Sequence, residues 1–141
     1  MANVLYDTGR NAFLQGSVNF VTDNIKAQFV NLVGAASPYI FNASLDQFFA
    51  SVPTSARVGT SASLAGKTAT AGIADAADTL ASAVSGVTIG AIIIYKVTGT
   101  ANATDQQLLA YIDTATGMPI QPNGGDITIA WDNGANKIFK L

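Results

Sequence analysis

The sequence predicts a mainly β fold, a single compact β-sandwich or barrel-like domain with one or two short helices that spans residues 1–141. Three observations favour it. β-branched residues dominate the run 87–97, residues 126–131 alternate between apolar and polar, and stretches of helical character are few and short. The length of 141 residues suits one domain.

Two short helices are expected in the first half of the chain. Residues 8–15 begin at Thr8, a residue type that caps helices, and are followed by Gly16, which can adopt the left-handed conformation of a helix stop. Residues 44–47 read Ser-Leu-Asp-Gln, a capping-box pattern that predicts a helix over 45–51.

Runs that are β-branched, or that alternate between apolar and polar residues, predict the strands. In chain order they are 18–21, 25–33, 87–97, 108–113, 126–131 and 137–141. Turn-forming residues fill the connections 22–24, 34–41, 98–106, 118–125 and 132–136. We expect 108–113 to pair with 87–97, and 137–141 to form a hairpin with 126–131.

Two stretches leave alternatives open. Residues 56–72 are rich in Ser, Thr, Ala and Gly, and they fit weak strands or a mobile loop equally well. Residues 73–85 have the alanine content and apolar spacing of a helix, but they also fit two short strands around the segment from Asp75 to Asp78.

The composition argues against catalysis. The chain has no His, Cys or Glu, so it lacks the usual proton shuttle at neutral pH, the thiolate nucleophile and the soft metal ligands. Its serines have no obvious activating base. We therefore expect a protein that is not an enzyme and that needs no cofactor and no metal.

Three local patterns could suggest chemistry, but the simpler interpretation is favoured for each. Asp75 and Asp78 could share a calcium ion, yet a calcium loop offers more carboxylates. Asp126 and Asp132 are too far apart along a strand to act as an acid pair. The segment 59–68 has six residues between its glycines, where a phosphate-binding loop has four.

Charge and hydropathy limit the classes of partner that the protein is expected to bind. A net charge of −2 is not the footprint of a nucleic-acid-binding protein, and the longest apolar run is too short to span a bilayer. Only 11% of residues are charged. Such a surface is expected either to pack against other protein or to be coated with neutral polar residues, and we favour packing.

Eight segments form an ordered pattern along nearly the whole chain: VTDNIKAQF (21–29), LDQFF (45–49), AGKTAT (65–70), DAADT (75–79), AIIIYKVTG (91–99), LLAYID (108–113), IAWD (129–132) and IFKL (138–141). This pattern resembles a family of small virion proteins of tailed bacteriophages and prophages. The chain departs from the family at Val97, where Asp is frequent, and in its more alanine-rich region 56–84. The resemblance favours strands for 73–85.

The resemblance implies a capsid decoration (cement) protein, located in the virion, that stabilises the head shell by bridging capsid subunits. Its partners would be the major capsid protein and copies of itself, with neither nucleic acid nor membrane. A tail or baseplate component is the first alternative. A host-surface or carbohydrate-binding module is the second, in which exposed Tyr6, Tyr39 and Tyr95 would stack on sugars.

Large apolar residues in the N-terminal arm, the loops and the short helix are expected to form the interface: Val4, Leu5, Tyr6, Tyr39, Phe41, Phe48 and Phe49. The arm 2–6 and the loop 34–41 would contact neighbouring subunits. The C-terminal strands would supply the domain's own core: Ile93, Tyr111, Ile129, Trp131 and Ile138. Removal of the arm is then expected to abolish capsid binding while leaving the melting temperature nearly unchanged.

Overall fold

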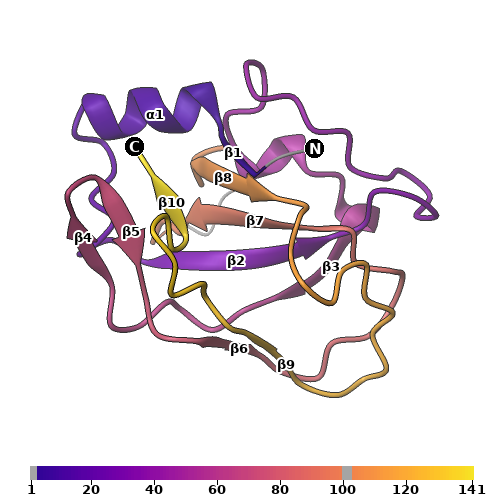
Figure 1. Cartoon of the computed structure of the whole chain (residues 1–141). Coiled ribbons are helices and arrows are strands. Elements are labelled where there is room, and N and C mark those ends of the chain that lie inside the picture. Colours follow the sequence, from indigo (N-terminus) through magenta and orange to yellow (C-terminus); the bar gives the residue numbers. More distant parts are fainter. Residues whose placement is uncertain (1–2, 100–102) are drawn as a thin grey trace.

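A five-stranded antiparallel sheet forms the centre of the computed structural model, which describes residues 3–99 and 103–141 (Figure 1). Its strands, in spatial order, are β1 (Val4–Leu5), β8 (Leu108–Ile112), β7 (Ala91–Lys96), β2 (Ile25–Val30) and β3 (Arg57–Thr60). The predicted pairing of β7 with β8 is confirmed, with Ile93 opposite Tyr111.

One face of this central sheet is covered by regular elements (Figure 1). They are the helix α1 (Asp7–Leu14), the sheet β10-β5-β4 (Phe139–Lys140, Ile73–Asp75 and Thr68–Thr70) and the strand pair β6-β9 (Thr79–Ala81 and Ile127–Ile129). Side chains from all of them join the sheet in one apolar cluster, which includes Ala12, Ala81, Ile129 and Phe139.

The opposite face is covered by residues 31–56, which we call the loop layer. Its only helical turns are two 3₁₀ segments, η1 (Phe49–Ser51) and η2 (Thr54–Ala56). Because both faces are covered, strand β7 is apolar and buried from Ala91 to Tyr95, and only its last residue, Lys96, is charged. Ile92 and Ile94 point into the apolar cluster just described, which we call the first cluster. Ile93 and Tyr95 point into a second cluster, which lies between the sheet and the loop layer.

The fold class is as predicted, a mainly β domain with several antiparallel sheets and one α-helix in the described ranges. The predicted core is confirmed as well: Ile93 and Tyr111 are buried in the second cluster, and Ile129, Trp131 and Ile138 in the first.

The first predicted helix is confirmed with a different cap. Helix α1 is preceded by Tyr6 rather than Thr8, and no side chain caps its first turn. The Thr8 hydroxyl instead donates to the carbonyl oxygen of Asp46 at 2.8 Å, which ties the helix to the loop layer. Gly16 follows the helix with φ of 71°, the left-handed conformation expected of a stop.

The predicted helix over 45–51 is wrong. The Asn42 side-chain oxygen accepts hydrogen bonds from the backbone N–H groups of Ser44 and Leu45, both at 3.1 Å. These bonds close one turn, which does not continue as a helix because the next backbone groups pair outside the segment: the Gln47 carbonyl oxygen accepts from the Leu108 N–H, and the Phe49 N–H donates to the Gln106 carbonyl oxygen, both at 2.9 Å. Helical geometry appears only in the three residues of η1.

The predicted strand over 18–21 is also wrong, because the chain turns there. The Asn19 side-chain oxygen accepts from the N–H groups of Val21 and Thr22 at 3.1 and 3.2 Å, which closes a turn. The next strand, β2, ends at Val30 rather than continuing to residue 33.

The two stretches that allowed alternatives contain short strands. Residues 56–72 hold β3 and β4, and residues 73–85 hold β5 and β6 on either side of the segment 76–78. The two-strand interpretation of 73–85 is therefore confirmed, and the helical one is wrong.

The predicted hairpin between 126–131 and 137–141 is wrong. Strand β9 pairs with β6, and β10 pairs with β5. The Trp131 indole N–H donates to the Thr79 hydroxyl at 3.1 Å, and the Lys137 ammonium lies 2.6 Å from an Asp75 carboxylate oxygen. These contacts hold both ends of the connecting loop against the segment that carries β5 and β6.

Candidate functional site

The seven residues predicted to meet a partner lie mainly in the core. Leu5, Tyr6, Tyr39 and Phe49 are buried, and Val4, Phe41 and Phe48 are half-buried. The described part of the arm, from Asn3 onward, is not free either, since β1 pairs with β8; Ala2 lies outside the described residues. The assignment of Leu5, Tyr6, Tyr39 and Phe49 to an exposed interface is therefore corrected, and for the three half-buried residues it stays a prediction.

A tyrosine network fixes the N-terminal strand to the loop layer. The Tyr39 hydroxyl donates to a carboxylate oxygen of Asp46 at 2.6 Å, and the Tyr6 hydroxyl lies 2.8 Å from that of Tyr39. Because the only hydroxyl proton of Tyr39 is used on Asp46, Tyr6 is the donor to Tyr39. Burial raises the pKa of both phenols well above their ordinary value.

Ring contacts complete the second core cluster. Phe41 stacks on Tyr111 with ring centroids 4.2 Å apart, and Phe49 stacks on Tyr95 at 4.6 Å. The Arg57 guanidinium covers the other face of the stack, 4.2 Å from the centre of the Phe49 ring. A sheet face without regular cover needs large apolar side chains from a loop, and the aromatic residues supply them.

The outward-facing side chains of the loop layer are different residues. Val33, Ile40 and Leu45 are 80%, 83% and 77% exposed. Each is a large aliphatic residue, and Ile40 stands directly between the inward-facing Tyr39 and Phe41.

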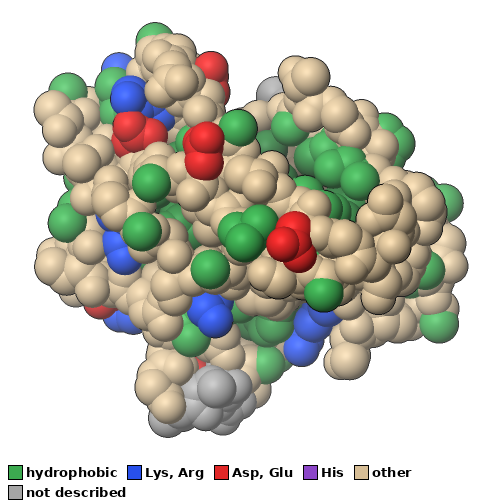
Figure 2. All heavy atoms as spheres, turned by 90° about the horizontal axis from the view of Figure 1, so that it is seen from below, with side chains coloured by type: hydrophobic (Ala, Val, Ile, Leu, Met, Phe, Trp, Pro, Cys, Tyr) green, Lys and Arg blue, Asp and Glu red, His purple; other side chains and the backbone are tan. Residues whose placement is uncertain are grey.

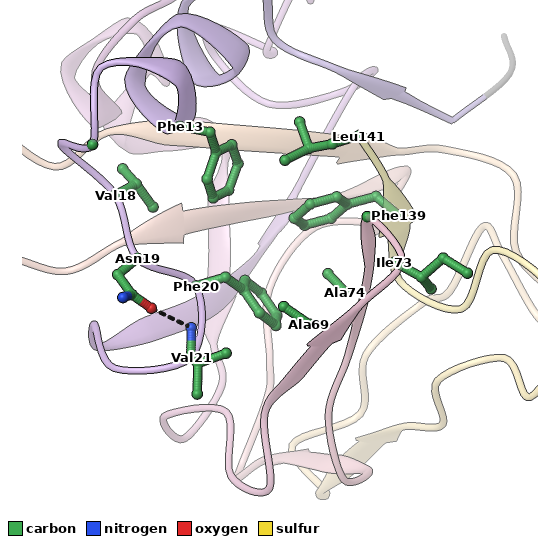
Figure 3. Close-up of a pocket in the computed structure, with 12 residues that line it drawn as sticks. Phe13, Val18, Asn19, Phe20, Val21, Ala69, Ile73, Ala74, Phe139 and Leu141 are labelled. Carbon is green, nitrogen blue, oxygen red and sulfur yellow. Dashed lines mark hydrogen bonds between the residues drawn. The ribbon is translucent and has the colours of Figure 1, made fainter.

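A pocket of about 310 Å³ lies at the end of the molecule where α1 meets the sheet β10-β5-β4 (Figure 3). Three aromatic rings form it. Phe139 lies 5.9 Å from Phe13 and 5.5 Å from Phe20, measured between ring centroids. Val21 and Leu141, which are 44% and 57% exposed, are also among the residues that line the pocket.

The wall of this pocket is fixed by polar contacts outside it. Besides closing the turn, Asn19 donates its backbone N–H to an Asp23 carboxylate oxygen at 2.8 Å. That carboxylate also pairs with the Lys96 ammonium at 2.9 Å. Desolvation raises the pKa of Asp23, but hydrogen bonds from Lys96 and the Asn19 N–H outweigh it, so the pKa lies below its ordinary value. The pocket is thus preformed, and its apolar lining suits an aliphatic or aromatic side chain.

A larger cleft, of about 850 Å³, separates the central sheet from the C-terminal segment (Figure 2). Its floor is apolar and includes Ile92, Ile112 and Met118. Figure 2 shows a hollow with such a hydrophobic floor on the face seen from below. Charged residues line it as well, among them Arg10, which pairs with Asp7 at 3.4 Å.

The carboxylates considered as calcium ligands have structural partners. Asp75 pairs with Lys137, and this hydrogen bond lowers the pKa of the Asp75 carboxyl. Asp78 accepts a hydrogen bond from the backbone N–H of Trp131 at 3.1 Å. Across the described ranges, no three acidic, His or Cys side chains gather as metal ligands would. In the same ranges, no helix has the length and hydropathy needed to span a membrane.

Comparison with known proteins adds no relative: no family model matches the chain, and no curated protein matches it.

Proposed function

We propose that this protein is a non-enzymatic structural protein of a tailed-phage virion, and that it decorates the capsid by bridging capsid subunits. The observation that carries the proposal is the outward-facing aliphatic set Val33, Ile40 and Leu45 on the loop layer. Three large aliphatic side chains exposed on one layer of a weakly charged surface support contact with other protein at that layer. The ordered resemblance to small phage virion proteins supplies the partner, the major capsid protein.

The build of the domain supports a role as a clamp. Each contact of a decoration protein needs only a modest buried area, since many copies act together on one shell. A rigid platform suits this role, and the loop layer is one. Its backbone is held by side chains, such as Asn31, which donates to the carbonyl oxygens of Val33 and Thr88 at 2.8 and 2.6 Å.

The carbohydrate-binding alternative loses the residues on which it depended. Tyr6, Tyr39 and Tyr95 are at most 4% exposed, so their rings cannot stack on a sugar. The pKa of Tyr95 is raised by burial, as it is for the other two.

Imaging of purified particles of the encoding phage, with this subunit labelled, tests the proposal. Density spread over the head shell supports decoration. A few copies confined to the tail overturn it and support the tail or baseplate alternative.

Binding of the purified protein to shells that lack it gives a second test. Ile40→Asp is expected to abolish binding, because a charge enters the apolar contact. Leu80→Asp is the matched control, since Leu80 is an exposed aliphatic residue of β6, outside the loop layer. Equal loss of binding in both variants would contradict the assignment of the contact to the loop layer.

A further inference from the structure

The chain contains two Asn-Gly steps, Asn123–Gly124 and Asn133–Gly134, and both lie in exposed loops. At such a step the backbone nitrogen of the glycine can reach the side-chain amide of the asparagine, because glycine places no side chain in the way. The same dipeptide therefore occurs twice in one molecule, and the two surroundings can be compared directly.

At the first Asn-Gly dipeptide, Asn123–Gly124, hydrogen bonds engage both groups that would react with each other. The Gly124 N–H donates to the carbonyl oxygen of Val84 at 2.8 Å, so the nitrogen that would attack is engaged. The Asn123 side-chain oxygen accepts from the Gly125 N–H at 2.9 Å, so the amide that would be attacked is engaged too. A further bond, from the Val84 N–H to the carbonyl oxygen of Gly125, closes this part of the loop at 2.9 Å.

The second step lies in the irregular connection between β9 and β10. Within the described residues, no hydrogen bond engages the Gly134 N–H or the Asn133 side chain. Residues 132–136 are all exposed. Exposed backbone without hydrogen bonds opens locally at little free-energy cost, which is the condition that ring closure at an Asn-Gly step requires.

We propose that Asn133 is a site of spontaneous deamidation in the folded protein, and that Asn123 is protected from the same reaction. The Gly134 backbone nitrogen loses its proton to solvent and attacks the side-chain carbonyl carbon of Asn133. A carbon–nitrogen bond closes a succinimide ring, and the side-chain nitrogen takes up a proton and leaves as ammonia. Water then opens the ring to aspartate or isoaspartate, without any change of oxidation state.

The product changes the charge and the length of this loop. Each converted copy gains one carboxylate beside Asp132, so the net charge goes from −2 to −3, because a neutral amide becomes an anion. The isoaspartate form also adds a methylene to the backbone. The loop has buried residues at both ends, Trp131 and Ile138, so the added length must be taken up by the exposed residues between them.

The test follows both sites in the full chain by peptide mass spectrometry during incubation at mildly alkaline pH. In the folded protein, Asn133 is expected to convert roughly tenfold or more faster than Asn123, because the bonds that protect Asn123 must open first. In urea that unfolds the chain, the two rates are expected to converge. Equal rates in the folded state, or a difference that persists in urea, would overturn the proposal.

Matched variants give an independent readout by ion exchange. Asn133→Gln is expected to remove the acidic species that accumulates with time, because glutamine cyclises far more slowly, and Asn123→Gln is expected to leave it. The reverse result would contradict the proposal. Substitution of Gly134 is not suitable, since a Cβ placed there would lie 2.5 Å from a carboxylate oxygen of Asp132.

Discussion

The two faces of the central sheet are covered in contrasting ways. On the first face, a helix and short strands satisfy their own backbone groups and contribute mostly aliphatic residues and phenylalanine. On the second, the backbone of the loop layer bonds partly to other backbone groups, as the Phe49 N–H does to the Gln106 carbonyl oxygen at 2.9 Å, and partly to side chains. The Arg57 guanidinium, for example, donates to the carbonyl oxygens of Phe49 and Val52. A face covered by loop therefore needs residues that combine large apolar area with polar groups, such as tyrosine.

Removal of residues 2–6 is the change with the largest expected effect, and it is now expected to unfold the protein. The deletion takes away strand β1 and the buried side chains of Leu5 and Tyr6, which join the two clusters on opposite faces of the sheet. Each such loss costs about 2–5 kcal/mol, against a total stability of about 5–15 kcal/mol. Urea denaturation followed by circular dichroism measures it.

The result also decides between two views of the N-terminus. A truncated protein with an unchanged melting temperature would show that β1 is dispensable, as the sequence suggested. Removal of Met1 and Ala2 alone is the control, and it leaves β1 in place.

Substitution of one phenylalanine on each face of the central sheet compares how much the loop layer and the regular elements contribute to stability. Phe49→Ala on the loop side and Phe139→Ala on the regular side are each expected to cost about 3–5 kcal/mol. Both rings are buried and both contact other rings. Thermal unfolding measures both variants. A loss below about 1 kcal/mol for Phe49 alone would show that the loop layer is not part of the cooperative core.

More of the central sheet than of the loop layer could be predicted from the sequence. The β-branched run 87–97 identified β7, the expected pairing with that run identified β8, and alternation placed Ile129 and Trp131 inward. The aromatic residues of the loop layer have no such period, and nothing in the sequence alone indicates that they face the core. Nothing local distinguishes Tyr39, which points inward, from Ile40, which points outward.

Side-chain hydrogen bonds explain most of the other errors. Asn19 and Asn42 each close a turn where strand or helix propensity was expected to win. The pairing of β10 with β5 depends on contacts between residues more than 60 positions apart, such as that of Lys137 with Asp75, and sequence periodicity does not report these. The candidate apolar pocket was missed because its three phenylalanines come from separate segments of the chain.

Alkaline pH is expected to weaken the loop face selectively. In the folded state the pKa values of Tyr6 and Tyr39 lie far above their ordinary value of 10.0, so only the unfolded chain releases these protons just above that pH. The free energy of unfolding should then fall by about 1.4 kcal/mol per pH unit for each of the two tyrosines. Urea titrations at a series of pH values measure this slope.

Tyr39→Phe provides the control for the alkaline effect. The variant keeps the ring but has no phenol to ionise at position 39, so its slope above pH 10 should be shallower than that of the unchanged protein. An identical slope in both proteins would mean that other groups dominate the alkaline transition.

Asp23→Asn tests a polar contact on the regular face, and its expected effect is smaller. Both side chains of the pair with Lys96 are 24% exposed, so the pair is only partly screened by solvent and the loss should be about 1 kcal/mol. Because the pKa of Asp23 is lowered in the folded state, its contribution is present above the ordinary value of 3.8 and is lost as the pH falls further. Acid titration of both proteins should show curves that converge at low pH; curves that stay parallel would exclude the carboxylate as the cause.

Ile40→Asp is expected to have the smallest effect on stability, although it lies next to two residues of the second core cluster, Tyr39 and Phe41. Its side chain is 83% exposed, so the free energy of unfolding should change by no more than about 0.5 kcal/mol. The same variant is expected to lose binding to capsid shells, so stability and binding separate at this position. A large loss of stability would show that Ile40 helps to hold the loop layer in place, and its exposure would then carry no argument for a partner.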